Sequence, residues 1–479
     1  MMEIIHQSRI DRELESLMER IYPPRVCIDN DSREECTVVK VDSANKDGIL
    51  LEMVQVLTDL DLVISKSFIS SDGGWFMDVF HVTDSFGNKL IDESLMLYIQ
   101  KALCASRRGE ISREKLGNSW KEEERVWRKK TAVELTGTDG PGLLSEISAV
   151  LVELGFKATS ATAWTHNDRA ACIIHVEDDS TSGPIDDPIR LAHVERHLEC
   201  VLEARGEKRS VRLTTLAAGR THTERRLHQL MYADRDYERC RACEAECGGE
   251  HKKECDGTHV WIGRCEEKGY WGVNVRSRDR PKLLFDTLCV LTDMNYVVFH
   301  AAIRSAGSMA HQEYFVRHKA SSTLLRESER QKLTLCLIAA IERRVSHGLR
   351  IDINTENRVG LMRELTRVFR ENGLWISRVE IGTRGDKAEG SFYVTDSAGG
   401  EVNPKIVELV RQQAGGSIVA VHRSPCRMST ASSSSSTREH KSGIEAVRKF
   451  SLGSMLWSQL ERLSDSFGSI RSSYLAYSE

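Results

Sequence analysis

Four short loops in the sequence combine residue types that could recognise a small charged molecule. Each loop begins with an Asn or Asp and ends immediately before an apolar, helix-like stretch, and the loops are residues 45–48, 139–142, 279–282 and 357–360. Free N–H groups at the start of a helix attract a carboxylate, whereas an Asn or Asp oxygen accepts a hydrogen bond from an ammonium or amide group. A loop of this kind could therefore hold a free amino acid.

The same residues also have a purely structural explanation. Asn and Asp cap helices by accepting hydrogen bonds from the first backbone N–H groups, and Pro141 and Pro281 are typical of a helix start. A glycine at the end of the loop allows a tight turn. The third loop departs from the pattern, because Lys282 replaces the glycine and could either obstruct a ligand or attract an anion. The residues alone leave both explanations open.

The four loops belong to four copies of one repeated unit. The agreement extends well beyond the loop and its helix, because a valine recurs at the same distance from every loop. These valines are Val82, Val176, Val316 and Val394. We therefore interpret the chain as four tandem descendants of one ancestral unit.

The pattern within a unit predicts its fold. A short β-like run precedes each loop, an amphipathic helix follows it, and two extended stretches separated by a turn come before a second helix. In the first copy these segments are 36–42, 49–60, 61–70, 75–84 and 91–103, and closing strands are predicted at 210–216 and 417–422 in the second and fourth copies. The fold class is therefore α+β, with four ferredoxin-like βαββαβ units and both helices of a unit on one face of its sheet.

These patterns also divide the chain. The predicted units are 33–108, 128–218, 267–346 and 347–424, with a Cys-containing linker at 219–266 and a serine-rich tail at 425–479. No closing strand is evident after the first and third units, so they are either incomplete or share an edge.

Two segments outside the units carry features of their own. The linker region contains cysteines and histidines that suggest either a zinc site or an incidental cluster, and their spacing does not fit the usual paired zinc knuckles. They are Cys240, Cys243, Cys247, His251, Cys255, His259 and Cys265. In the tail, apolar residues from Ile444 to Leu463 recur at near-helical spacing and could form a helix that docks on a partner protein.

Composition excludes several classes of protein. The 479 residues have a net charge of −4, which does not favour nucleic acid as a partner. No apolar run approaches the roughly 20 residues that a membrane-spanning helix needs. The charged N-terminal residues and the 13 scattered cysteines predict a reduced, cytoplasmic or nuclear setting. We find no phosphate-binding loop, HExxH or GxSxG motif, and we predict neither catalysis nor a cofactor or metal.

The loop pattern DGPGLL at 139–144 resembles the ACT domain, a small regulatory fold. Longer phrases, such as VDSANKDGILLEMVQVLTDL and DRPKLLFDTLCVLTDMNYVVFH, are similar to those of the plant ACT-domain-repeat (ACR) proteins from about residue 20 to 424. The resemblance implies that ACT units pair side by side, within the chain or in a homodimer, and bind an amino acid at their interface. The family also resembles the sensing modules of the bacterial uridylyltransferase that reads glutamine, which makes glutamine a candidate ligand.

Carried over to this sequence, the resemblance implies three sets of ligand contacts. They are Asn45, Asp47 and Gly48 in the first unit, Asp139, Gly140 and Gly142 in the second, and Asn357 and Gly360 in the fourth. The functional expectation is a non-catalytic amino-acid sensor. The alternative is a scaffold that has kept the fold, lost the ligand and docks an as yet unidentified partner protein.

Overall fold

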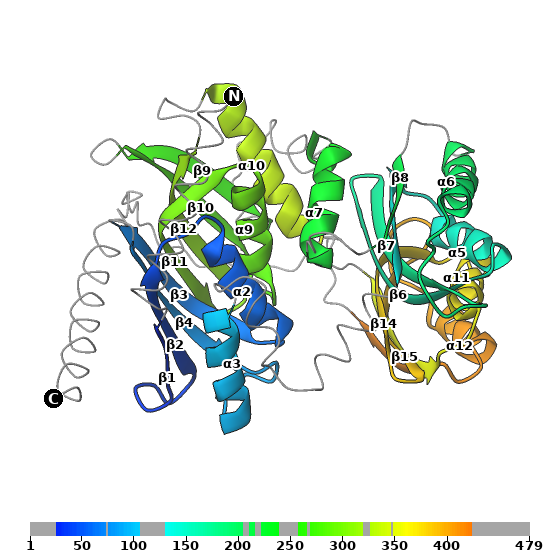
Figure 1. The fold of residues 1–479 in the computed structure, drawn as a ribbon, viewed down its shortest axis with the longest axis horizontal. Coiled ribbons are helices and arrows are strands. Elements are labelled where there is room, and N and C mark those ends of the chain that lie inside the picture. The colour runs from blue at the N-terminus through cyan, green and yellow to red at the C-terminus, as the bar shows by residue number, and fades with distance from the viewer. Residues whose placement is uncertain are drawn as a thin grey trace, which may run out of the picture.

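In this computed structural model, the structure describes residues 25–72, 75–105, 130–204, 210–215, 222–238, 257–265, 269–319, 326–345 and 348–423. These residues form two eight-stranded antiparallel sheets, each with helices packed on one face (Figure 1). The predicted α+β fold class is confirmed. Among the described residues, no helix is both long enough and apolar enough to cross a membrane.

The first sheet joins the first and third units in the strand order β1-β2-β4-β3-β11-β12-β10-β9. The first unit comprises β1 (Arg25–Asp29), β2 (Thr37–Ala44), α2 (Ile49–Asp59), β3 (Val63–Asp72), β4 (Trp75–Thr83) and α3 (Glu93–Ala105). The third comprises β9 (His259–Cys265), β10 (Tyr270–Arg278), α9 (Leu283–Asp293), β11 (Tyr296–Ala306), β12 (Met309–His318) and α10 (Glu327–Glu342).

The second sheet joins the second and fourth units in the order β16-β13-β15-β14-β6-β7-β5-β8. The second unit comprises β5 (Thr131–Thr138), α5 (Leu143–Glu153), β6 (Phe156–His166), β7 (Arg169–Asp178), α6 (Pro188–Glu203) and β8 (Ser210–Thr215). The fourth comprises β13 (Leu349–Glu356), α11 (Leu361–Glu371), β14 (Trp375–Arg384), β15 (Lys387–Thr395), α12 (Pro404–Gln413) and β16 (Ile418–Arg423).

Units therefore pair alternately along the chain, first with third and second with fourth. Each pair meets where the same strand of both units runs antiparallel, and we call these two lines the β3–β11 seam and the β6–β14 seam. Ser67 lies opposite Ile303 at the first, and Ala163 lies opposite Val379 at the second. Pairing within one chain extends each small sheet to eight strands and leaves only its outer edges unpaired.

The first and third units differ from the prediction in the position of one strand along the chain. Their edge strands, β1 and β9, come before the unit rather than after it, whereas β8 and β16 come after. Since β1 pairs antiparallel with β2 just as β8 pairs with β5, both arrangements fill the same edge. Each unit is therefore complete, the two units pair with each other along β3 and β11, and β9 lies within the segment that was predicted as a linker.

The helix after each loop packs its apolar side on the sheet. In α2, residues Leu50, Met53, Val54 and Leu57 recur at helical spacing and all are buried. Each of the four helices begins after a residue in the left-handed conformation, with φ of 81° at Gly48, 79° at Gly142 and 81° at Gly360. Lys282 adopts the same conformation with φ of 65°, although a side chain disfavours it.

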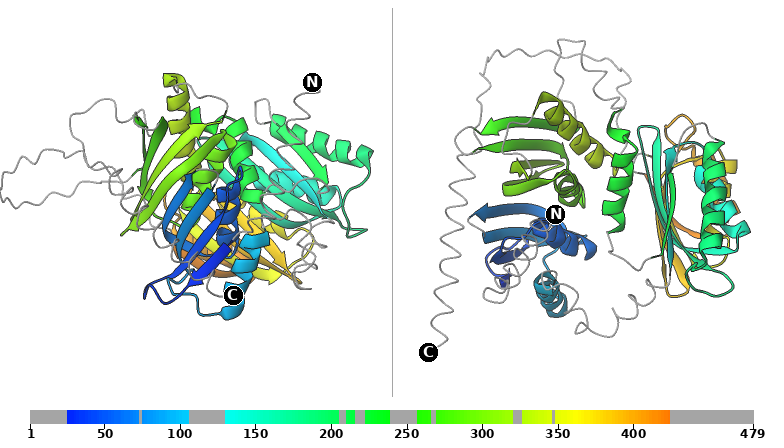
Figure 2. Two further views of the ribbon diagram at one scale, coloured as in Figure 1. Left: turned by 60° about the vertical axis from the view of Figure 1, so that its left-hand side comes forward. Right: turned by 45° about the horizontal axis from the view of Figure 1, so that its top comes forward.

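One more helix, α7 (Thr223–Ala233), lies between the two pairs of units (Figure 2). On one side, Leu227 and Met231 pack against Trp164, Ala171 and Ile173 on the face of the second sheet that carries no other described helix. On the other side, α7 contacts α9 of the first sheet. The helix therefore joins the two pairs, and it too lies in the segment that was predicted as a linker.

A buried group of charged side chains holds this junction together. Asp286 is fully buried and contacts Arg280, Arg344 and His228 at 2.7, 2.8 and 2.9 Å. Arg344 also pairs with Glu224 of α7 at 3.0 Å. Burial alone would raise the pKa of Asp286, but Arg344 and Arg280 hold it well below its usual range. The junction therefore contains buried charges, and each of them is stabilised by an oppositely charged partner.

Candidate functional site

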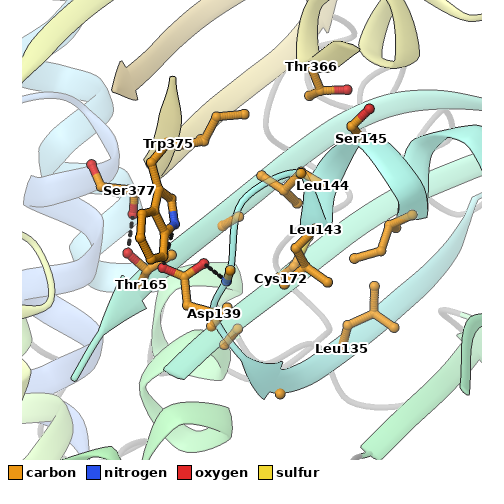
Figure 3. A pocket seen from close by; sticks show the side chains of 18 of the residues that line it. Leu135, Asp139, Leu143, Leu144, Ser145, Thr165, Cys172, Thr366, Trp375 and Ser377 are labelled. Atoms are coloured by element: carbon orange, nitrogen blue, oxygen red, sulfur yellow. Dashed lines mark hydrogen bonds between the residues drawn. The ribbon is translucent and has the colours of Figure 1, made fainter. Parts of the chain in front are cut away.

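A cavity lies at the β6–β14 seam, between the start of α5 and the first residues of β14 (Figure 3). Its empty volume, counted together with its open mouth, is about 580 Å³. Both paired units supply its walls. The second unit contributes the loop at 139–142 and the first turn of α5, and the fourth unit contributes Thr366, Arg370 and residues 374–378.

The first turn of α5 presents two backbone N–H groups without acceptors. Leu143 N–H donates to the carbonyl of Gly140 at 3.2 Å, and Glu146 N–H donates to that of Gly142 at 3.0 Å. The amides of Leu144 and Ser145 lie between them and have no hydrogen-bond acceptor among the described residues. Both residues line the cavity. An anion placed here would meet two free donors and the positive end of the helix dipole.

Asp139 lines the same cavity as these amides. Its carboxylate accepts hydrogen bonds from Gly140 N–H at 2.8 Å and from the indole Nε1–H of Trp375 at 3.0 Å. Burial raises the pKa of Asp139 to about 6, even though both hydrogen bonds act to lower it. No cation among the described residues pairs with this carboxylate. The wall therefore holds an acidic group that a ligand ammonium would stabilise.

Many of the buried side chains that line the cavity are apolar. Those at most 5% exposed include Leu135, Ile147, Ala163, Cys172 and Leu202, and the hydroxyl residues Ser145 and Thr366 are as deeply buried, at 4% and 1%. The thiol of Cys172 is neutral, because burial raises its pKa to about 12. Figure 3 shows Asp139, Thr165 and Trp375 grouped on one side of the space, with Leu135 and Cys172 on the other.

A second, smaller cavity is related to the first by the pairing of the two units. It has an empty volume of about 330 Å³ and lies between the start of α11 and the beginning of β6. Asn357 and Leu361 of the fourth unit line it together with Ala158 and Ser160 of the second. Gly360 is the left-handed residue directly before Leu361.

At the β3–β11 seam, a large side chain occupies the place that corresponds to the first cavity. Phe76 lies opposite Ser43 in the first unit just as Ala170, which lines the cavity, lies opposite Gly137 in the second. Phe76 is only 2% exposed. Asn45 donates a hydrogen bond to Ser71 at 2.5 Å. Asp47 forms an ion pair with Lys319 of the third unit at 2.9 Å, and Gly48 directly precedes α2.

In the third unit, side chains of the protein occupy the surroundings of the loop at 279–282. Lys282 pairs with Glu224 of α7 at 2.9 Å, so its charge serves the junction between the two pairs. Phe285, fully buried, is the third residue of α9, where α5 has Ser145. Burial opposes the ionisation of Glu224, but Arg344 and Lys282 lower the pKa of this residue to about 2.

The structure thus distributes the loop residues among different environments. Asp139, Gly140 and Gly142 line the larger cavity and Asn357 lines the smaller, whereas Asn45 and Asp47 bond to other side chains. Sequence reasoning missed Trp375, Thr366 and Arg378, which come from the fourth unit. Only the pairing of β6 with β14 brings them to the loop of the second unit, so no spacing along the chain could have indicated them.

The predicted features outside the units are described only in part. Cys240, Cys243, Cys247, His251 and Cys255 lie outside the described residues, as does the tail with its helical pattern. Cys265 and His259 are in β9, where His259 stacks on Trp261. Within the described ranges, no three His, Cys, Asp or Glu side chains are grouped so that they could hold a metal ion.

Comparison with known proteins agrees with this architecture. Residues 32–110 match the model of the ACR family N-terminal ACT domain, and residues 350–415 match that of the ACT domain. The chain is 53% identical to the ACT domain-containing protein ACR1 of Arabidopsis thaliana over 98% of this chain and all of that protein. It is 49% identical to ACT domain-containing protein ACR3 of the same plant over 85% of this chain and 89% of that one.

A shorter match is found with a bacterial enzyme. The bifunctional uridylyltransferase/uridylyl-removing enzyme of Azospirillum brasilense is 40% identical over 81 residues, which cover 17% of this chain and 9% of the enzyme. The full-length matches decide the assignment, because they extend across all four paired units. The chain belongs to the ACR family of ACT-domain proteins.

Proposed function

We propose that this protein is a non-catalytic sensor that binds a free amino acid in the larger cavity of the β6–β14 seam. The ligand carboxylate would accept hydrogen bonds from the amides of Leu144 and Ser145. Its ammonium group would pair with Asp139, and its side chain would enter the apolar part of the cavity. Both charged ends of an amino acid would then meet a group of opposite polarity, the two amides at one end and the Asp139 carboxylate at the other.

The observation that carries this proposal is the position of the Asp139 carboxylate. A carboxylate that burial makes harder to ionise is costly unless a cation joins it. Here it lines a cavity that is open to solvent and that also contains two amide donors without acceptors among the described residues.

Ligand binding at the β6–β14 seam would also affect the first and third units. Arg378 lines the cavity and donates a hydrogen bond to the backbone carbonyl of Arg344 at 3.1 Å. Arg344 is part of the buried charged group that holds α7 and α9 together. A ligand that favours one arrangement of Arg378 would therefore bias the junction, by no more than its difference in affinity for the two arrangements.

The alternative function is a ligand-free scaffold that docks a protein partner. The β3–β11 seam favours it for the first and third units, since Phe76 and the Lys282–Glu224 pair occupy the corresponding places. We therefore assign the first pair a structural role and the second pair the ligand.

A thermal-shift screen of the full chain against the twenty amino acids tests the proposal. A ligand at about 100 times its dissociation constant should add about 2.7 kcal/mol to the stability of the folded state. The diagnostic variant is Ala170→Phe, which places in the second unit the side chain that the first unit carries at the same strand position. It should fold and should lose the shift.

The matched control is Ala388→Phe, which makes the same change in the smaller cavity. It should keep the shift. If no amino acid stabilises the folded wild-type protein, the sensor proposal is wrong and the scaffold is favoured. If Ala170→Phe responds as strongly as wild type, the ligand binds elsewhere.

A further inference from the structure

The larger cavity offers different chemistry at its two ends. At one end are Asp139 and the indole of Trp375, and the free amides of α5 also line the cavity. The other end is formed by Leu135, Ile147, Ala163, Cys172 and Leu202. The first end suits the ammonium and carboxylate that every amino acid carries, so only the second can discriminate among amino acids.

Most polar side chains that line the cavity have other partners or lie near the first end, and Arg370, in the last turn of α11, is exposed. The hydroxyl of Thr165 donates to the carbonyl of Ser377 at 3.1 Å, and that of Thr366 donates to the carbonyl of Met362 at 2.7 Å. Ser145 lies beside the free amides, where the carboxylate would bind. Thr136 is the neighbour of Leu135 along β5 and therefore points to the opposite face of the sheet.

We infer that this cavity selects an amino acid with an apolar side chain, and that Cys172 is a specificity-determining residue. This inference rests on the proposed function. A side-chain amide or charge at the inner end would lose its water and find no partner among these hydrocarbon groups, which is costly. Glutamine, the candidate suggested by resemblance to bacterial sensing modules, is therefore disfavoured at this seam.

The first and third units carry polar residues at the strand position that Cys172 occupies in the second unit. Cys172 lies opposite Leu135 on β5, and the corresponding pairs are Asp78 with Val41 and Gln312 with Val275. The first and third units thus bury polar side chains at this strand position, 0% and 2% exposed. The fold tolerates a polar residue here, and the second unit has instead a thiol that burial keeps neutral.

The test compares pairs of amino acids that have similar shapes but different polarity. Titration calorimetry on the full chain would measure dissociation constants for leucine and asparagine, methionine and glutamine, and valine and threonine. We expect the apolar member to bind about 10- to 100-fold more tightly in each pair that binds, because the polar member leaves groups unpaired. Tighter binding of asparagine, glutamine or threonine would overturn the inference while leaving the sensor function intact.

The variant Cys172→Gln tests the residue itself. It introduces the side chain that the third unit carries at this position and should reduce the preference for the apolar member at least tenfold. Cys200→Gln makes the same change at an exposed position on α6 and should leave the preference unchanged. Equal preference in wild type and Cys172→Gln would overturn the role of Cys172. Failure of all six amino acids to bind wild type would overturn the selectivity, whereas failure of all twenty in the thermal-shift screen would overturn the function on which it rests.

Discussion

The junction between the two pairs of units should depend strongly on the charge of Asp286. Asp286→Asn keeps the shape of the side chain but removes a fully buried negative charge that contacts Arg280 at 2.7 Å and Arg344 at 2.8 Å. In this variant Arg344 would keep Glu224, at 3.0 Å, as a counter-charge. Removing one partner of a buried ion pair typically costs about 3–5 kcal/mol, so we expect a loss of this size in the free energy of unfolding.

Asp293→Asn is the matched control, because it removes the same charge from the last residue of the same helix. Asp293 is partly exposed and pairs with Arg225 at 2.6 Å, so its loss should cost about 0–1 kcal/mol. Urea denaturation of both variants, followed by circular dichroism, measures the two losses. If Asp286→Asn cost no more than Asp293→Asn, the buried charges would not hold the junction and this reasoning would be refuted.

Two further predictions concern Asp139 and a tight contact in the fourth unit. The pKa of Asp139 in the folded state, about 6, lies above its ordinary value of 3.8, so its ionisation destabilises the fold as pH rises from 4 to 6. The difference in stability between wild type and Asp139→Asn should therefore change over this interval by up to about 3 kcal/mol, before screening by solvent, and a flat difference would contradict it. Gly390→Ala would place a Cβ atom 2.0 Å from the carbonyl oxygen of Glu380 and should cost about 1–3 kcal/mol in chemical denaturation. Gly382→Ala meets nothing within 4 Å on the neighbouring strand and should cost distinctly less; equal losses would show that the contact relaxes freely.

Much of the fold can be predicted from the sequence, because helix and strand periodicities are local. The spacing of Leu50, Met53 and Leu57 predicts α2, and the repeated valines predict the central strands. The edge strands β1 and β9 were not predicted, since a short strand at an edge has a weak pattern of its own. Its identity depends on the strand beside it, and for β1 that strand is β2.

The pairing of alternate units also lies beyond the sequence. All four units carry the same kind of seam strand, so nothing in the repeats indicates that β6 pairs with β14 rather than with another copy. The loop residue Asp139 could be named from the sequence as a candidate ligand contact, whereas Trp375 could not. Nor could the sequence show that Phe76 is buried at the first seam whereas Ala170, at the equivalent position, lines a cavity at the second.

Hydrogen exchange of the full chain, with and without the amino acid that gives the largest thermal shift, tests the central claim most directly. The amides of Leu144 and Ser145 have no acceptor within the part of the chain that the structure describes. A bound carboxylate would accept hydrogen bonds from both, so the account predicts that their exchange slows when ligand is present. The corresponding amides of Leu50 and Leu51, at the filled seam, should be unchanged. Protection at Leu50 and Leu51, or none at Leu144 and Ser145 under saturating ligand, would contradict the account.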